Sequence, residues 1–262
     1  MESTDNVKLP TSPLLEVKDL TCSFGGVLAV DGASFTVAKG CVTGLIGPNG
    51  AGKSSVVNAI AGAVKPNAGR VVFRGEEIQD LQPHQVATRG LTRIYQQSTE
   101  FGAMTVLENL LAASKEFTGS AFLVSVRGKR AWRELEERAI LRARELLKRF
   151  DLGDKESDFA KSLSGGQKRL LEFARALMTE PELLILDEPL AGVNPALAQR
   201  IASEMEILRD SGLTILLIEH DLPLVERICS EVVVMANGRV ISTGTMDHIR
   251  NQREVVDAYL SR

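Results

Sequence analysis

The feature that most constrains this chain is a glycine-rich run at residues 47–54, Gly-Pro-Asn-Gly-Ala-Gly-Lys-Ser. It matches the pattern G-x-x-x-x-G-K-[ST], whose glycines let successive backbone N–H groups curl around phosphate oxygens. The apolar segment Cys41–Ile46 before it predicts a short strand, and Lys53–Ala63 after it predicts a helix whose positive end faces the loop. A strand, loop and helix in this order predict an α/β fold that binds a nucleoside triphosphate.

Two side chains of this loop have specific expected roles. Lys53 can reach the β- and γ-phosphates, and the hydroxyl of Ser54 can bind Mg²⁺. The other residues that we expect to contact the phosphates are Gly47, Pro48, Asn49, Gly50, Ala51, Gly52 and Ser55. The loop alone predicts nucleotide binding and leaves the use of the nucleotide open.

Composition narrows the possibilities further. The chain has 262 residues, with 44% hydrophobic and 25% charged residues, as in an ordinary globular protein. Its formal net charge of −3 gives no reason to expect nonspecific binding to nucleic acid. The three cysteines are far apart and lack metal or redox spacing, which predicts reduced thiols. No apolar run approaches the roughly 18–20 residues that cross a bilayer, so we expect any membrane role to depend on a partner.

A second chemical feature is an apolar strand that ends in two carboxylates. Leu183–Leu186 predicts a buried strand, and Asp187 and Glu188 follow it directly. Beside a phosphate loop, Asp187 can hold Mg²⁺, and Glu188 can orient or deprotonate an attacking water. The alternative is a strand that only exits into a turn.

The third feature is Leu-Ser-Gly-Gly-Gln at residues 163–167, before a helical pattern that runs to Met178. Ser164 is a good helix N-cap, and Gly165 and Gly166 expose N–H groups at the positive end of that helix. Together with Gln167 they form a possible second anion site. A glycine turn before a helix is common, so the specificity lies in the complete five-residue pattern.

The remaining pattern predicts an α/β core that is interrupted by a helical insertion near residues 97–180. Further strands are expected at Leu14–Phe24, Ala33–Val37, Gly69–Phe73, Leu91–Tyr95 and Leu213–Ile218, with turns at 24–26 and 31–32 and a helix at about 196–210. Asn237-Gly238 between Val232–Ala236 and Arg239–Thr243 predicts a β-hairpin.

Within the insertion, Arg127–Phe150 predicts an amphipathic helix, with Trp132, Leu135, Ala139, Ala143, Leu146 and Phe150 on one face. Its basic side chains outnumber its acidic ones. We interpret them as a solvated face, with contact to anionic lipid headgroups as the alternative.

Taken together, these residues resemble the ATPase subunit of an ATP-binding cassette (ABC) transporter, from Leu14 to Leu260. The resemblance implies a P-loop NTPase fold: a RecA-like core, an antiparallel β-subdomain and a helical subdomain. It implies a tail at 1–13 and one ABC ATPase domain at 14–262. It also implies a head-to-tail dimer, in which each ATP lies between the phosphate loop of one subunit and the Leu-Ser-Gly-Gly-Gln segment of the other.

The resemblance assigns roles to three further residues. Phe24 matches an aromatic residue that stacks on adenine, although a core aromatic beside a glycine turn is the alternative. Gln96 matches a glutamine that touches Mg²⁺ and links the core to the helical subdomain; Gln97 is its alternative, and either could be a solvated loop residue. His220, at a strand end, matches a histidine that contacts the γ-phosphate.

One stretch departs from the common pattern and indicates a subfamily. Residues 191–195 read Ala-Gly-Val-Asn-Pro, so Asn194 stands where most cassettes have an aspartate. This departure resembles the larger ATPase subunit of branched-chain amino-acid importers. The same resemblance is carried by Phe24-Gly25-Gly26, residues 104–110, Leu217–Asp221 and the ending at 257–260. Urea and amide importers share much of the pattern.

The expected function is therefore ATP hydrolysis by an importer subunit, with ATP and Mg²⁺ bound. Expected partners are a second cassette, identical or different, transmembrane permease subunits and, indirectly, an extracytoplasmic solute-binding protein, with no nucleic acid. The expected location is the cytoplasmic face of the membrane. The groove for the permease is expected at about Gln97–Leu110. The alternative is that Met104-Thr105-Val106 simply opens a core helix. Both could hold if Met104 and Phe101 pack inward while the rim of the groove stays exposed. The alternatives are a soluble cassette ATPase and a regulatory module without hydrolysis.

Overall fold

The computed structural model describes residues 13–96, 100–115 and 129–260. A six-stranded sheet forms its centre, in the order β10-β9-β3-β8-β7-β6. These strands are β3 (Val42–Ile46), β6 (Leu91–Ile94), β7 (Leu183–Asp187), β8 (Thr214–Ile218), β9 (Glu231–Ala236) and β10 (Arg239–Gly244). They are parallel except for the β9–β10 hairpin predicted at Asn237-Gly238. Strands β3, β7 and β8 are buried along their whole length, which explains their uninterrupted apolar sequences.

A second, antiparallel sheet has the order β2-β1-β4-β5. It consists of β1 (Leu15–Phe24), β2 (Val27–Val37), β4 (Ala68–Phe73) and β5 (Glu76–Glu77). The turn predicted at Asp31-Gly32 is wrong, because β2 continues through both residues with irregular register against β1. Gly32 has a φ of 68°, and the N–H of Asp31 donates to the carbonyl of Gly238 at 2.9 Å. This local kink therefore joins the second sheet to the hairpin of the first.

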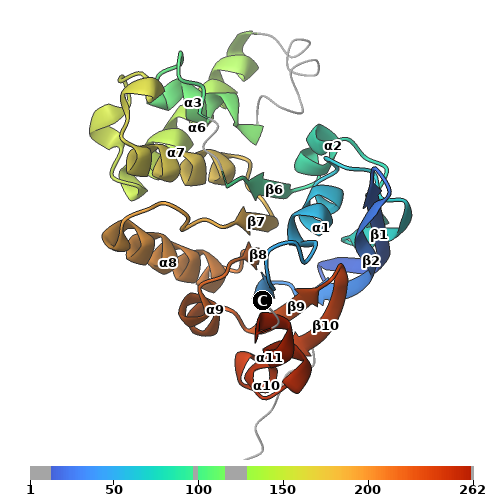
Figure 1. The fold of residues 1–262 in the computed structure, drawn as a ribbon. Coiled ribbons are helices and arrows are strands. Elements are labelled where there is room, and N and C mark those ends of the chain that lie inside the picture. Colours follow the sequence, from blue (N-terminus) through green and yellow to red (C-terminus); the bar gives the residue numbers. More distant parts are fainter. Residues whose placement is uncertain (1–12, 97–99, 116–128, 261–262) are drawn as a thin grey trace, which may run out of the picture.

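Helices cover both faces of the central sheet (Figure 1). Helix α1 (Lys53–Ile60) lies between the two sheets, and its apolar side chains join one core cluster with residues of both. Helices α8 (Pro195–Asp210) and α9 (Leu222–Ile228) contribute to the core on the opposite face. The other helices of the core are α2 (Pro83–Thr88), α10 (Met246–Arg250) and α11 (Arg253–Leu260).

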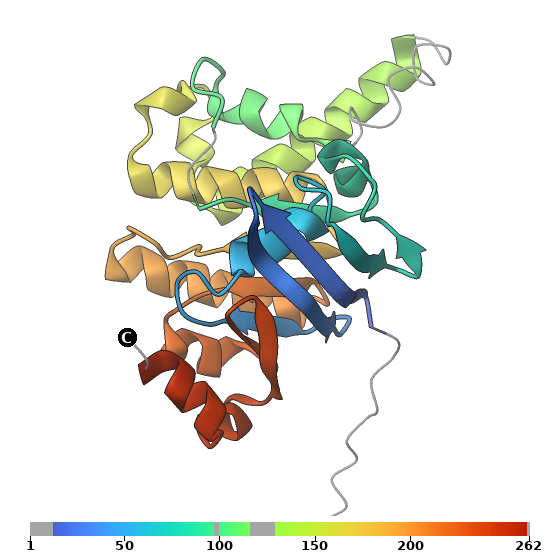
Figure 2. The same ribbon diagram turned by 45° about the vertical axis from the view of Figure 1, so that its right-hand side comes forward.

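A helical part lies between β6 and β7 in the chain and forms the upper left of Figure 1. It contains α3 (Val106–Ala112), α6 (Lys129–Arg149) and α7 (Gly165–Met178), which contact one another, and the 3₁₀ turns Gly153–Lys155 and Ala160–Ser162. The turned view in Figure 2 shows α6 projecting away from the sheets at its N-terminal end. The apolar face predicted for this helix is correct at Ala139, Ala143, Leu146 and Phe150, which are buried, and wrong at Trp132, which is 41% exposed.

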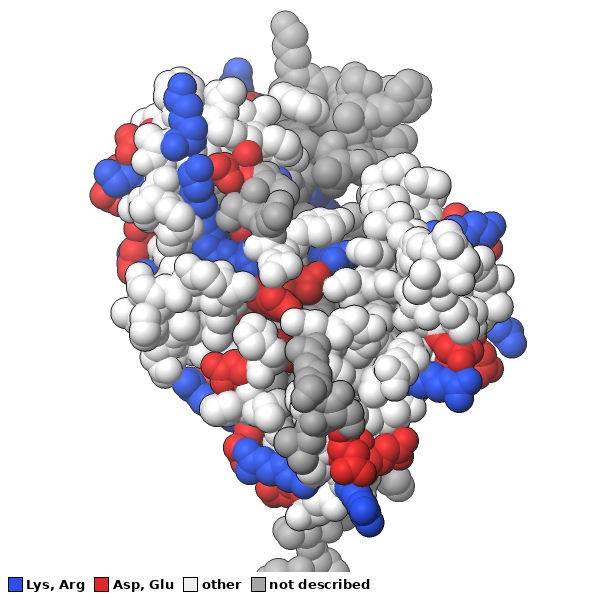
Figure 3. Space-filling model, in the orientation of Figure 1, with Lys and Arg blue, Asp and Glu red and all other residues white. Residues whose placement is uncertain are grey.

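Basic residues of α6 pair with carboxylates elsewhere in the fold. Arg144 contacts Glu156 at 2.9 Å and Arg149 contacts Glu204 at 2.8 Å. On the face shown in Figure 3, side chains of both signs are interspersed. Both observations favour the solvated-face interpretation. Within the described ranges, no helix combines the length and apolarity needed to cross a membrane. The predicted tail at 1–13 lies outside the described residues except for Pro13.

Candidate functional site

The glycine-rich loop connects β3 to α1, as predicted, and two of its glycines are required by close backbone contacts. A Cβ at Gly47, which has a φ of 147°, would lie 2.1 Å from the carbonyl oxygen of Met235. A Cβ at Gly52, with a φ of 98°, would lie 2.4 Å from the carbonyl oxygen of Ala29. Any side chain at either position would therefore clash with the backbone.

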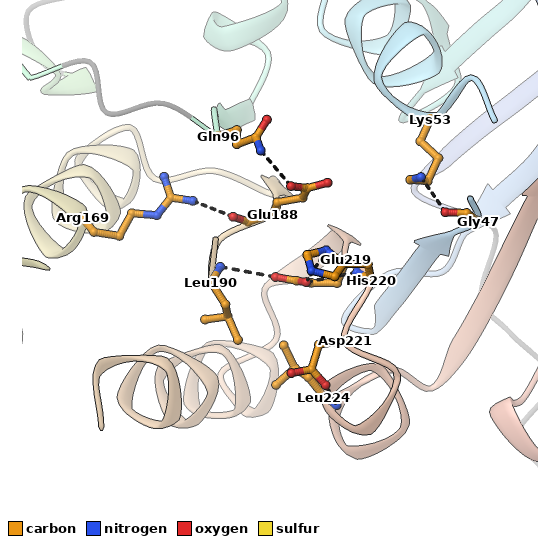
Figure 4. A network of polar contacts seen from close by, with 10 residues as sticks. All are labelled: Gly47, Lys53, Gln96, Arg169, Glu188, Leu190, Glu219, His220, Asp221 and Leu224. Atoms are coloured by element: carbon orange, nitrogen blue, oxygen red, sulfur yellow. Dashed lines mark hydrogen bonds and ion pairs between the residues drawn. The ribbon is translucent and has the colours of Figure 1, made fainter. Parts of the chain in front are cut away.

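The ammonium group of Lys53 lies beneath this loop. Its Nζ donates to the carbonyl oxygen of Gly47 at 2.7 Å (Figure 4). It also donates to the carbonyl oxygen of Pro48 at 3.0 Å. The residue is only 9% exposed, so the positive charge is held close to the loop. Ser54, in contrast, is exposed in the first turn of α1. A fixed cation beside the backbone N–H groups of a glycine-rich loop suits the binding of a polyphosphate.

Asp187 ends β7 and forms an ion pair that the sequence did not reveal. Nη2 of Arg93, on the neighbouring strand β6, donates to its Oδ2 at 2.6 Å. Nη1 of Arg93 donates to Oδ1 of Asn58 on α1, also at 2.6 Å. The side chains of Arg93 and Asp187 are 7% and 11% exposed. One guanidinium thus connects the strand-end carboxylate to the helix that follows the phosphate loop.

Glu188 lies directly after this strand, at the edge of the cleft that the phosphate loop forms. Its backbone has a φ of 46°, which is unusual for a residue other than glycine. The side-chain amide of Gln96 donates to its Oε2 at 2.8 Å (Figure 4). The cleft, of about 280 Å³, is lined by Glu188 together with Ala29, Asn49, Gly50, Ala51, Gly52, Lys53, Ser54 and Ser55.

His220 follows β8, and its side chain is 71% exposed. Glu219 before it is buried, with 2% exposure, and its Oε2 accepts from the backbone N–H of His220 at 3.1 Å. Burial raises the pKa of the Glu219 carboxyl, an effect that the N–H donors of His220 and Leu190 oppose. The structure therefore places an exposed imidazole beside a buried carboxylate at the end of the central sheet.

The Leu-Ser-Gly-Gly-Gln segment begins α7, as predicted, but none of its residues lines this cleft. The hydroxyl of Ser164 accepts from the N–H of Gln167 at 3.3 Å, and the Gln167 side chain accepts from the N–H of Ser164 at 2.9 Å. This reciprocal capping leaves Gly165 exposed at the helix start. Phe24, at the end of β1, is 44% exposed and also lies outside the lining of the cleft.

Four buried charged residues of this region were not singled out from the sequence: Arg93, Arg169, Glu172 and Glu219. Each is a charged residue within an apolar strand or helix face or, for Glu219, directly after an apolar strand, which was the available signal. Arg169 donates to the carbonyl oxygens of Tyr95 at 2.8 Å, Pro189 at 3.1 Å and Glu188 at 3.3 Å. It therefore connects α7 to the segments that bear Gln96 and Glu188.

The residues present fit a nucleotide with a hard cation. Ser54, Gln96 and Asp187 offer a hydroxyl, an amide and a carboxylate oxygen, and Mg²⁺ usually takes one or two protein ligands beside phosphates and water. Among the described residues no group of three His, Cys, Asp or Glu could hold a metal by itself.

Comparison with known proteins gives the family. Residues 30–191 match the family model of the ABC transporter. The chain is 40% identical over 249 residues to the high-affinity branched-chain amino acid transport ATP-binding protein BraF of Pseudomonas aeruginosa, covering 95% of this chain and 98% of BraF. It is 37% identical over 251 residues to LivG of Escherichia coli K12, which has the same description, with coverage of 95% and 98%.

Solved structures agree. The ADP conformation of an ATP-binding cassette of an ABC transporter superimposes with a TM-score of 0.81 at 36% identity, covering 96% of this chain and all of that one. A nucleotide-free cassette superimposes with a TM-score of 0.80 at 37% identity, with coverage of 94% and 98%. These comparisons confirm the resemblance and the fold class inferred from the motifs. The chain belongs to the ABC transporter family, as one of the nucleotide-binding cassettes that hydrolyse ATP in connection with transport.

Proposed function

We propose that this chain is the ATP-hydrolysing subunit of an importer of branched-chain amino acids. Two relatives of nearly equal length are described as serving such transport. The observation that supports hydrolysis most directly is the meeting of Glu188 and Gln96 at the cleft that contains Lys53. A general base, an amide and a phosphate-binding cation come from three separate segments of the chain.

In the proposed reaction, Lys53 and the loop N–H groups bind the phosphates. Lys53 exchanges its contacts to the loop carbonyls for phosphate oxygens as ATP enters. Mg²⁺ held by Ser54, Gln96 and Asp187 would neutralise charge on the phosphates. Glu188 orients and deprotonates the attacking water, and exposed His220 contacts the γ-phosphate. If Gln96 were to bind the cation, its hydrogen bond to Glu188 would be released and the carboxylate would be free to act on the water.

We propose that the site of a single chain is incomplete and that a second cassette completes it. Gly165 and Gly166 form the N-terminal end of α7 outside the cleft of their own chain, where they can meet the nucleotide of a partner. Phe24 is exposed and available to stack on adenine. Closure excludes water and brings in the last contacts, so assembly controls the chemistry.

The helical part offers a surface for a permease. Phe101 and Met104 are 47% and 40% exposed and so do not pack inward, the arrangement that would have joined a groove to a core helix, whereas Val106 and Leu110 are buried. Residues 97–99 of the predicted groove lie outside the described ranges. We propose that this apolar surface receives the permease at the cytoplasmic face of the membrane, with a solute-binding protein acting on the other side.

The nucleotide part of this proposal is tested with two variants. E188Q retains ATP binding and blocks hydrolysis, so ATP is expected to convert it to a dimer in size-exclusion chromatography. K53A is expected to lose ATP binding in an equilibrium assay. If ATP leaves the elution of E188Q unchanged at high protein concentration, the shared site is wrong for two copies of this chain. Micromolar ATP affinity in K53A would contradict the phosphate-loop assignment.

The solute is tested by uptake. Cells that lack this chain are expected to lose ATP-dependent uptake of labelled leucine and to regain it with the wild-type chain but not with E188Q. Loss of urea or amide uptake instead would favour the related importers. A cassette ATPase outside transport would change neither uptake.

A further inference from the structure

Glu219 is a buried carboxylate to which the proposed reaction gives no role. It follows the apolar strand β8 directly, and only 2% of its side chain is exposed. A carboxylate is costly to bury unless hydrogen bonds compensate it. The contacts that Glu219 makes are therefore informative about its function.

The two oxygens of Glu219 bind two different segments of the site. Oε1 accepts from the backbone N–H of Leu190 at 3.3 Å, and Oε2 accepts from the backbone N–H of His220 at 3.1 Å (Figure 4). The same Oε2 lies 3.7 Å from Nδ1 of the His220 ring. One side chain thus joins the turn after Glu188 to the residue proposed to contact the γ-phosphate.

The turn that Glu219 contacts has an unfavourable backbone. Glu188 has a φ of 46°, in the left-handed region that costs energy for residues with a side chain. Its N–H donates to the carbonyl of Ile218 at 2.9 Å. From the other side, Arg169 donates to the carbonyls of Glu188 and Pro189 at 3.3 and 3.1 Å. Surrounding contacts of this kind are what maintain a strained conformation.

We propose that Glu219 is a positioning residue for ATP hydrolysis, which fixes the turn bearing Glu188 and the backbone of His220 relative to each other. Glu219 and Leu190 are not among the residues that line the phosphate-loop cleft. The effect of Glu219 is on the alignment of the catalytic carboxylate and the imidazole. The inference rests on the roles proposed above for Glu188 and His220.

The variant E219Q tests this role with little change in volume. An amide has one acceptor oxygen, so its NH₂ group must face either the Leu190 or the His220 N–H, and one of the two hydrogen bonds is lost. We expect kcat to fall about 10- to 100-fold, as small misplacements of reacting groups do. The KM and equilibrium affinity for ATP are expected to stay within about twofold, because the phosphate loop is untouched.

A matched control is E204Q. Glu204 is a half-buried carboxylate, 13% exposed, that binds Arg149 between α8 and α6, and it is not among the residues lining the cleft. E204Q is expected to retain the wild-type kcat. Both variants are assayed as full chains at high concentration with ATP and Mg²⁺, below the melting temperature that circular dichroism gives for each. A wild-type kcat in folded E219Q overturns the proposal.

A double variant separates positioning from a general loss of structure. Residues that act as one catalytic unit have effects that do not multiply. If Glu219 acts through His220 and the turn, the loss in E219Q/H220A is smaller than the product of the two single losses. If the loss of kcat in the double variant equals the product of the two single losses, the proposal is overturned. If E219Q does not fold, E219D is the test, because its shorter side chain draws both oxygens back from the N–H groups. A reduced kcat with normal ATP affinity in E219D supports positioning. A wild-type kcat in E219D overturns the proposal.

The single variants E188Q and H220A distinguish this inference from the proposed function. If either retains wild-type hydrolysis, the proposed roles of those residues fail. If both lose activity and E219Q does not, only the role of Glu219 fails.

Discussion

Arg93 holds Asp187 in a buried ion pair, with 2.6 Å between Nη2 and Oδ2. The two residues come from neighbouring strands, and the same guanidinium binds Asn58 on the helix after the phosphate loop. The carboxylate proposed to bind Mg²⁺ is therefore positioned by a cation that belongs to the fold itself.

Replacement of Arg93 by methionine is expected to destabilise the fold. Removing one partner leaves the Asp187 charge buried and unpaired, which costs about 3 kcal/mol in comparable pairs. Urea unfolding followed by circular dichroism measures the loss. The matched control is R89M: Arg89 is 40% exposed and pairs with exposed Glu76, so about 1 kcal/mol or less is expected. If R93M and R89M lose the same unfolding free energy, burial does not make the Arg93 ion pair more important than an exposed one.

Phe24→Ala is expected to weaken ATP binding. Stacking of a base on an aromatic ring contributes about 1–3 kcal/mol, so the Kd should rise roughly tenfold. Calorimetric titration of the E188Q background with ATP measures this without hydrolysis. F159A is the control, because Phe159 is similarly exposed, at 52%, but lies in the helical part. An unchanged Kd in F24A would remove Phe24 from the nucleotide site.

Asn194, the departure from the usual aspartate, caps a helix. Its Oδ1 accepts from the N–H of Leu197 at 2.9 Å at the start of α8. N194A is expected to lose about 1 kcal/mol of unfolding free energy, whereas N194D keeps an acceptor and adds a favourable charge at the helix N-terminus. Thermal unfolding of the three proteins checks the order. If N194D is as unstable as N194A, the cap does not explain this residue.

Much of the central sheet follows from local sequence, because β3, β7 and β8 are buried runs of apolar residues next to glycine turns or carboxylates. Short helices and strands cannot be predicted from local sequence in this way. Strand β5 has two residues and α9 has seven, and both depend on tertiary contacts more than on their own propensity. Gly32 illustrates the same limit: a turn signal became a kink within a strand because Asp31 pairs with the distant hairpin.

The candidate site likewise has a part that follows from local sequence and a part that does not. The phosphate loop and the capped start of α7 were predictable, because their geometry is set by adjacent residues. The partner of Asp187 was not, since Arg93 is 94 positions away and only the parallel pairing of β6 with β7 brings them together. Glu219 likewise binds Leu190 across 29 positions. Local sequence thus indicates the candidate reacting groups, and the fold determines what positions them.

The pH dependence of stability provides an independent check on Glu219. Burial raises its pKa in the folded protein above the ordinary value of 4.5, so the folded state holds this proton more tightly than the unfolded state. The resulting stabilisation is complete below pH 4.5 and is lost as the pH rises through the raised value. The unfolding free energy of wild type minus that of E219Q is therefore expected to fall from pH 4.5 towards neutrality, in urea titrations at several pH values.

The opposite sign is expected for Glu206, which makes E206Q the control. The hydrogen bond from Arg227 lowers the pKa of Glu206 below 4.5, so its stabilisation is present above pH 4.5 and is lost as the pH falls through the lowered value. The unfolding free energy of wild type minus that of E206Q should therefore rise with pH below 4.5, whereas the unfolding free energy of wild type minus that of E219Q falls with pH above 4.5. A difference for E219Q that rises with pH would mean that the hydrogen bonds from Leu190 and His220 outweigh the burial of this carboxylate.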